Sequence, residues 1–98
     1  MGGGPATKEV DAVDDNTNPT GFSFKPATLT VNKGDTVVFK NTSTDQHGIA
    51  WDTAGAPPNT GLFGPGTSTS VVMSNAGTFN YHCFVHGAQM NGQITVNP

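Results

Sequence analysis

The sequence predicts an all-β protein, folded as an antiparallel sandwich or barrel of short strands. Apolar and polar residues alternate with a period of two along much of the chain, and no amphipathic stretch has the length of a helix. The 98 residues include 13 glycines and 7 prolines, a composition that favours many turns. A chain of this length is expected to form one domain around a single core.

The first part of the chain is expected to contain four strands, over residues 8–13, 21–25, 28–32 and 36–40. The first of these alternates weakly and is followed by a polar loop. The second carries Phe22 and Phe24 on one face, and the third places Leu29 and Val31 together. The fourth reads TVVFK, and its β-branched and aromatic residues are typical of a buried strand.

The second part of the chain begins with a long irregular region. Residues 41–67 are rich in Gly, Pro, Asn and Thr, so loops should dominate there, with one short strand over 47–51. Further strands are expected over residues 68–73, 78–83 and 93–96. Met73 lies beside two valines in an extended pattern, so we expect it to pack in the core.

Composition and charge exclude several classes of function. Four lysines, no arginine and seven acidic residues give a net charge of −3, which is a poor match for nucleic acid. No apolar run approaches the roughly 18 residues that cross a bilayer, so we expect no membrane span in this chain. The one cysteine, Cys83, excludes an internal disulfide framework and a zinc site of paired cysteines.

The glycine-rich start, MGGGP, differs from the rest of the chain. We expect residues 1–7 to be a disordered or artificially added N-terminus, and residues 8–98 to form the single domain. The same start would also suit a linker that tethers the native full-length protein to a membrane anchor.

The segment with the most chemical information reads YHCFVHGAQM over residues 81–90. It places the thiol of Cys83, the imidazole of His86 and the thioether of Met90 within eight positions, at a strand-to-loop junction. A tight loop can fold three such donors around one metal ion. Thiolate and thioether ligands select copper over harder cations, and imidazole suits both copper oxidation states. The segment therefore predicts a site for one copper ion.

A second histidine, distant in the sequence, is needed to complete the site, and His47 and His82 are the candidates. Within the strand over 78–83, Phe79, Tyr81 and Cys83 share one face, whereas His82 points to the other. His82 therefore cannot easily reach a metal ion held by Cys83. We expect the second histidine to be His47, which follows the 41–45 loop and can approach from a neighbouring strand end.

Four segments together resemble the cupredoxins, most closely the plastocyanin, amicyanin and halocyanin-like branch: VFKN at 38–41, HGI at 47–49, YHCFVH at 81–86 and MNG at 90–92. The similarity covers most of the chain. It implies a Greek-key β-sandwich of seven to eight strands with one type 1 (blue) copper ion near one end. By this resemblance His47, Cys83 and His86 are the equatorial ligands and Met90 is the axial ligand. The resemblance also implies that the N–H of Gly48 points at the thiolate.

The loop between the last two ligands departs from the usual spacing. Three residues separate His86 from Met90, whereas plastocyanins usually have four and amicyanins two. Gln89 is therefore an alternative axial ligand, because its amide oxygen can also bind copper weakly. The Met-x-Gly continuation favours Met90.

The predicted site favours an electron carrier over an enzyme. Three donors in a plane with a long axial contact leave little room for substrate, and one cysteine with three histidines cannot build a second copper centre. We expect a non-enzymatic monomer that cycles Cu(II) and Cu(I) between a redox protein donor and a redox protein acceptor. The alternative is a copper-binding module for storage, delivery or sensing.

Docking and location follow from the same chemistry. His86 belongs to a loop and should lie nearer the surface than Cys83, so we expect transient docking near His86, against Gly87, Ala88 and Phe63. Copper thiolates belong outside the reducing cytosol. The expected location is therefore periplasmic, extracellular-facing or lumenal.

Overall fold

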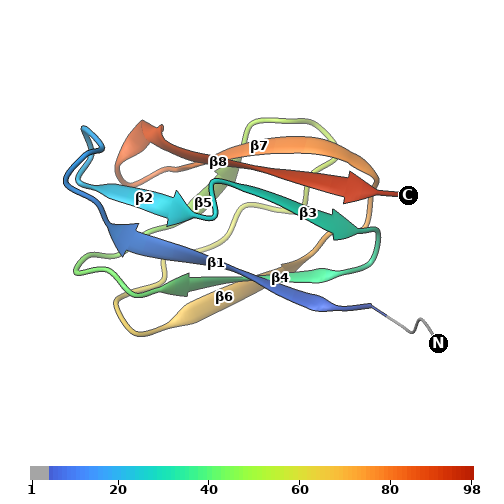
Figure 1. The fold of residues 1–98 in the computed structure, drawn as a ribbon, viewed down its shortest axis with the longest axis horizontal. Coiled ribbons are helices and arrows are strands. Elements are labelled where there is room, and N and C mark those ends of the chain that lie inside the picture. Colours follow the sequence, from blue (N-terminus) through green and yellow to red (C-terminus); the bar gives the residue numbers. More distant parts are fainter. Residues whose placement is uncertain (1–4) are drawn as a thin grey trace.

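The computed structural model describes residues 5–98, and within this part of the chain the regular secondary structure is all β-strand. The eight strands are β1 (Thr7–Asp14), β2 (Phe22–Lys25), β3 (Thr28–Asn32), β4 (Thr36–Asn41), β5 (Ile49–Trp51), β6 (Ser68–Val72), β7 (Gly77–Cys83) and β8 (Gly87–Asn97) (Figure 1). The predicted all-β fold class is confirmed.

The strands form a sandwich of two four-stranded sheets (Figure 1). One sheet has the order β2-β1-β4-β6 and the other β3-β8-β7-β5. Four pairings are antiparallel, as expected, whereas β1 with β4 and β3 with β8 are parallel. Alternation in a sequence indicates which face of a strand is buried but not the direction of its neighbour, so it could not indicate these two parallel pairs.

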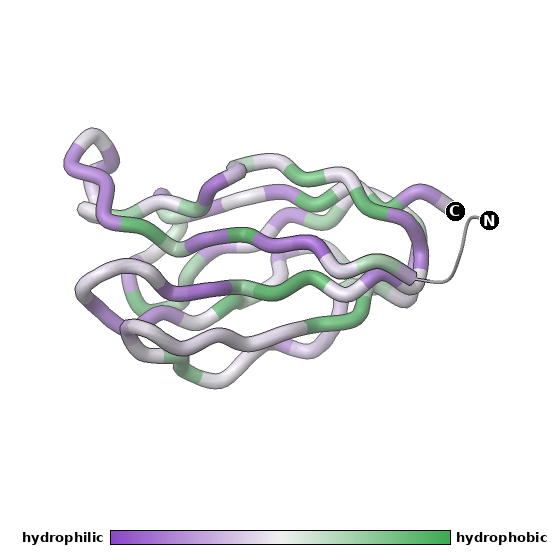
Figure 2. Tube along the Cα trace, turned by 60° about the horizontal axis from the view of Figure 1, so that its bottom comes forward, coloured by the Kyte–Doolittle hydropathy of each residue, from purple (hydrophilic) through white to green (hydrophobic). Residues whose placement is uncertain are grey.

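The core lies between the two sheets and is built from alternate residues of the strands. Val37 and Phe39 of β4, for example, are fully buried, and Figure 2 shows hydrophobic positions alternating with hydrophilic ones along the chain. Phe24, Phe39, Trp51 and Tyr81 pack edge to face, with ring centroids 5.0–6.3 Å apart. Such aromatic pairs add to the free energy gained from burial and so stabilise the middle of the sandwich.

The end of the sandwich where β7 ends and β8 begins lies opposite the end that carries both termini (Figure 1). β8 begins at Gly87, well before the strand expected over 93–96. Its first residues pair irregularly, because the register shifts between His82 and Cys83. Residues 87–92 have glycines at both ends and Met90 as the only large apolar side chain, so they lack the alternation by which a strand is predicted.

β1 begins at Thr7, the last residue of the predicted N-terminal segment 1–7, and the division into residues 1–7 and 8–98 stays a prediction. Residues 1–4 of the predicted 1–7 terminus lie outside the described residues. The N–H of Ala6 donates to the Asp35 carboxylate at 2.8 Å. Among residues 5–98, no helix has the length and apolarity to cross a membrane.

Asp35 ties the start of β1 to the turn between β3 and β4, and its replacement should make stability depend less on pH. Its carboxylate also accepts the N–H of Asn32 at 2.9 Å, and these two backbone donors lower the pKa of Asp35. A carboxyl group whose pKa is lower in the folded than in the unfolded state stabilises the fold above its unfolded pKa of about 3.9. That stabilisation is lost as the pH falls through the lower, folded value.

We expect Asp35→Asn to unfold at a lower denaturant concentration than the wild type at neutral pH, since an amide offers one acceptor in place of two. The gap should narrow as the pH falls below about 4, where the Asp35 carboxyl of the unfolded wild-type chain becomes protonated, and should be smallest below the lower pKa of the folded state. Urea unfolding of the wild type and the variant, at neutral pH and at a pH below about 4, measures this difference. A gap that stays constant across the range would show that the Asp35 charge does not stabilise the fold.

Candidate metal centre

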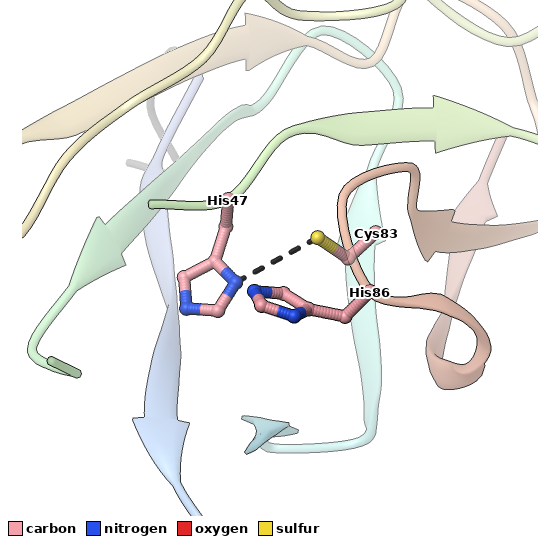
Figure 3. Close-up of side chains that lie close together, drawn as sticks. All are labelled: His47, Cys83 and His86. Carbon is pink, nitrogen blue, oxygen red and sulfur yellow. Dashed lines mark hydrogen bonds between the residues drawn. The ribbon is translucent and has the colours of Figure 1, made fainter. Parts of the chain in front are cut away.

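Three donor side chains meet at the β7–β8 end of the sandwich. His47 precedes β5, Cys83 is the last residue of β7, and His86 lies in the short turn that leads into β8. One donor atom of each lies within 4.8 Å of the others. Figure 3 shows the three side chains pointing toward one another. The structure thus brings together the donor atoms of three of the four predicted ligands, His47, Cys83 and His86.

His47 is fixed by backbone and side-chain contacts. Its backbone pairs with Phe63 through two hydrogen bonds, of 3.1 and 2.9 Å. Its Nδ1 lies 3.6 Å from Cys83 Sγ, and its Nε2 lies 2.7 Å from Ser43 Oγ. The side chain is fully buried, and this burial, aided by the nearby His86, lowers the pKa of His47 to about 4. The imidazole is therefore neutral at pH 7, as a metal ligand must be.

Cys83 is a free, fully buried cysteine opposite Ile49 of β5. Phe79, Tyr81 and Cys83 are buried on one face of β7, as the alternation predicts. His82 lies on the other face, where its Nδ1 is 2.9 Å from the carboxylate of Asp52. The pairing of β5 with β7 therefore brings His47, and not His82, to the thiol.

His86 is the least buried of the three donors, with 14% of its side chain exposed. Its Nε2 lies 3.2 Å from the carbonyl oxygen of Gln46 and 3.6 Å from the Asp45 carboxylate. The ring of Phe22, at the start of β2, packs against both imidazoles, with centroids 4.5 Å from His86 and 5.0 Å from His47. The sequence places Phe22 in a strand but offers no sign of this contact, which depends on how β2 lies across the end of the sandwich.

Burial distinguishes the two candidates for the axial position. Met90 is fully buried in β8. Gln89 is exposed, and its backbone carbonyl accepts a hydrogen bond of 3.0 Å from the Asn18 side chain. The irregular pairing places residues 88–90 between Gly87, which faces Cys83, and Asn91, which faces His82. The three-residue spacing between His86 and Met90 therefore coincides with an irregular segment of β8 in which Met90 is buried.

Gly48 joins the two segments that carry the donors. Its carbonyl accepts the N–H of Phe84 at 3.1 Å. A Cβ at Gly48 would overlap the outer end of the Phe84 ring, so any larger residue there would require this half-exposed ring to move. The expected Gly48 N–H contact to the thiolate stays a prediction.

The expected docking surface needs one correction. Phe63 is only 4% exposed, because its backbone pairs with His47 and its side chain belongs to the core. The exposed apolar side chains nearby in the chain are Leu62, Phe84 and Val85. An apolar residue in a Gly- and Pro-rich loop can face either way, so its burial could not be predicted from the sequence.

The donor set fits copper. One thiolate and two imidazoles, with a thioether nearby in the chain, are softer ligands than magnesium, calcium or manganese prefer. Burial of Cys83 and His47 keeps water from both donors.

Comparison with known proteins agrees with this chemistry. Residues 11–97 match the family model described as copper binding proteins, plastocyanin/azurin family. Plastocyanin of Vicia faba is 35% identical over 89 residues, which cover 79% of this chain and 90% of the relative. Chloroplastic plastocyanin of Pisum sativum is also 35% identical over 89 residues, and this chain spans only 53% of that relative's length.

A solved structure gives the same fold. The purple cupredoxin from Nitrosopumilus maritimus superposes with a TM-score of 0.79 at 21% identity, over 92% of this chain and 99% of that one. The sandwich, the soft donor set and the match over 11–97 lead to one conclusion: this chain is a cupredoxin of the plastocyanin/azurin family, and its cofactor is copper.

Proposed function

We propose that this protein is a non-enzymatic electron carrier that holds one type 1 copper ion and cycles it between Cu(II) and Cu(I). His47, Cys83 and His86 are the proposed equatorial ligands and Met90 the proposed axial ligand. The observation that carries the proposal is the convergence of one buried thiol and two imidazoles within 4.8 Å. A thiolate, two histidines and a weak axial methionine form the copper site that transfers electrons.

The protein's contribution is to hold these donors in one arrangement for both oxidation states. Copper supplies the one-electron couple, and its two states prefer different geometries. Cys83 is fixed in a paired strand, and His47 is fixed by its two backbone bonds to Phe63. Phe22 packs against both imidazole rings. Because these contacts hold the side chains in place, the ligands cannot move to the geometry that either Cu(II) or Cu(I) prefers. Little rearrangement therefore accompanies electron transfer.

The storage, delivery or sensing alternative lacks support among residues 5–98. Transfer of copper to another protein would use additional soft donors near the site. Met73 is 1% exposed within the core, and His82 is paired with Asp52 on the outer face. Competition with a Cu(I) chelator separates the two functions. A carrier should retain its copper through reduction and reoxidation, whereas a delivery protein should release Cu(I) readily.

We propose that electrons leave and enter through His86 during brief contacts with a redox protein donor and acceptor. His86 is the donor nearest to solvent, at 14% exposure, while Cys83 and His47 are fully buried. Phe84 and Val85, in the same turn, are 46% and 38% exposed. A small apolar surface of this kind suits weak, rapidly reversed redox encounters of a monomer.

A charge beside His86 should slow electron transfer without altering the copper site. We expect Val85→Glu to lower the rate of electron self-exchange between oxidised and reduced copies by about tenfold, because docking would bring two carboxylates together. NMR line broadening in mixtures of the two states measures the rate, and the absorption spectrum checks the site.

Val72→Glu is the matched control, since Val72 is 51% exposed and pairs with Thr36 at the other end of the sandwich. Its rate should stay near that of the wild type. If Val72→Glu slowed exchange and Val85→Glu did not, the His86 route would be wrong.

The axial position should respond to Met90 and not to Gln89. We expect Met90→Gln to keep a coloured site but lower its reduction potential, because an oxygen donor favours Cu(II) over Cu(I). Gln89→Ala should leave the potential nearly unchanged, because Gln89 is exposed. Voltammetry of the two variants measures both potentials. If Gln89→Ala changed the potential and Met90→Gln did not, Gln89 would be the axial ligand.

We also propose a periplasmic, extracellular-facing or lumenal location. In the cytosol, abundant reduced thiols would compete with Cys83 and Met90 for soft Cu(I).

A further inference from the structure

A buried hydrogen-bond network lies behind His47, on the side away from Cys83. It is formed by Asn41, Ser43 and His47, which are 0%, 5% and 0% exposed. Ser43 Oγ lies 2.7 Å from His47 Nε2 and 2.7 Å from Asn41 Oδ1. The opposite edge of the same imidazole presents Nδ1 to Cys83 Sγ.

Asn41 is held in one orientation by groups that can only accept hydrogen bonds. Its Nδ2 donates to the carbonyl oxygens of Asp45 at 2.7 Å and Phe63 at 3.0 Å. Reversing the amide would place its oxygen against both carbonyls. Its backbone is held at the end of β4 by two hydrogen bonds of 2.9 Å. The N–H of Asn41 donates to the carbonyl of Thr67, and the carbonyl of Asn41 accepts the N–H of Gly66. Asn41 Oδ1 therefore faces Ser43 as an acceptor.

The single hydroxyl proton of Ser43 then has a defined direction. Its two pure acceptors are Asn41 Oδ1 and, at 3.1 Å, the carbonyl oxygen of Asp45. Donation to either one leaves a lone pair of Ser43 Oγ facing His47 Nε2. A bond of 2.7 Å between those two atoms then requires that Nε2 carry the proton. Nδ1 is left unprotonated, with its lone pair available on the Cys83 side.

We infer that Ser43 is a positioning residue for the copper site: oriented by Asn41, its hydroxyl accepts the Nε2–H of His47 and fixes the tautomer and ring orientation that aim Nδ1 at the metal position beside Cys83. This inference rests on the proposed function for the identity of the ligands. Outer hydrogen bonds of this kind set the tautomer of a metal-bound histidine and make the ring a stronger donor. Ser43 should therefore favour Cu(II), the harder of the two ions.

The test compares Ser43→Ala with Ser43→Thr in the copper-loaded protein. Ser43→Ala removes the acceptor for Nε2–H but leaves Asn41 Oδ1 bonded to the backbone N–H of residue 43, 2.9 Å away in the wild type. Ser43→Thr retains the hydroxyl. We expect Ser43→Ala to bind Cu(II) about tenfold more weakly, with a smaller loss of affinity for Cu(I). This difference raises the reduction potential of the copper. Each tenfold difference between the two affinities corresponds to about 59 mV. Ser43→Thr should restore the wild-type values.

A second readout detects the Nε2–H of His47 directly. In the diamagnetic Cu(I) protein, NMR of ¹⁵N-labelled histidine should show a His47 Nε2–H that exchanges slowly with water and lies close to the Ser43 side chain. In Ser43→Ala this proton should exchange faster. A rapidly exchanging or absent Nε2–H in the wild type would overturn the inference, and so would a Ser43→Ala protein with unchanged copper affinity and potential.

These results are separable from the proposed function. The copper-loaded protein could fail to pass electrons to a redox partner while the Nε2–H and the Ser43 variants behave as expected. That result would contradict the carrier function and support the role of Ser43. If the protein cycled normally while Ser43→Ala matched the wild type, only the role of Ser43 would fall.

Discussion

Cys83→Ser should abolish the intense blue absorption of the Cu(II) protein, even if some copper remains bound. The colour of a type 1 site comes from charge transfer between thiolate sulfur and Cu(II), and Cys83 is the only cysteine in the chain. Serine is nearly isosteric at this fully buried end of β7, so the fold should persist. The absorption spectrum and the copper content of the purified variant provide the measurement.

His82→Ala is the control, because His82 adjoins Cys83 but lies on the opposite face of β7 with Asp52. Its Cu(II) form should remain blue. A Cys83→Ser protein as blue as the wild type would remove Cys83 from the site.

Gly92→Ala should cause a large loss of stability. A Cβ at this position of β8 would overlap Oη and Cζ of Tyr81, which is 1% exposed and packed against Phe24, Phe39 and Trp51. Because the ring has no free direction to move, we expect a loss of about 1–3 kcal/mol in the free energy of unfolding. Urea unfolding at neutral pH measures it.

Two comparisons locate the cause of that loss. Gly61→Ala adds the same methyl group in open space and should change stability by less than about 0.5 kcal/mol. Tyr81→Phe removes a buried hydroxyl that has no hydrogen-bond partner within residues 5–98, so it should recover part of the loss in the Gly92→Ala background. If Gly61→Ala were equally destabilising, a general cost of replacing glycine, and not the overlap with Tyr81, would be responsible.

Much of the fold, and the pairing of Cys83 with His86, could be predicted from local sequence patterns. Alternation in residues 78–83 places Cys83 on the buried face and His82 on the other, and the structure agrees. Close spacing made Cys83 and His86 recognisable as a pair, because a tight turn must keep them near each other. These features depend on residues that are neighbours in the sequence.

His47 is distant in the sequence, and its choice follows from the exclusion of His82 and from the resemblance to the cupredoxins. Other features that depend on contacts between distant segments could not be predicted. The parallel pairing of β1 with β4, the contact of Phe22 with both imidazoles and the burial of Phe63 each require the other sheet or loop to be in place. Ser43 lies in a polar loop of common turn residues, and the proton direction in its network follows only from measured distances to Asn41 and His47.

Titration of the metal-free protein with Cu(II) tests most directly whether Cys83 and its neighbouring donors hold one copper ion that cycles between two oxidation states. The absorption spectrum is followed during this titration and during one subsequent reduction and reoxidation. We predict that an intense blue band grows until one equivalent is bound, disappears on addition of one electron per copper and returns fully on reoxidation. A weakly coloured product, binding of several equivalents, or loss of copper on reduction would contradict the account.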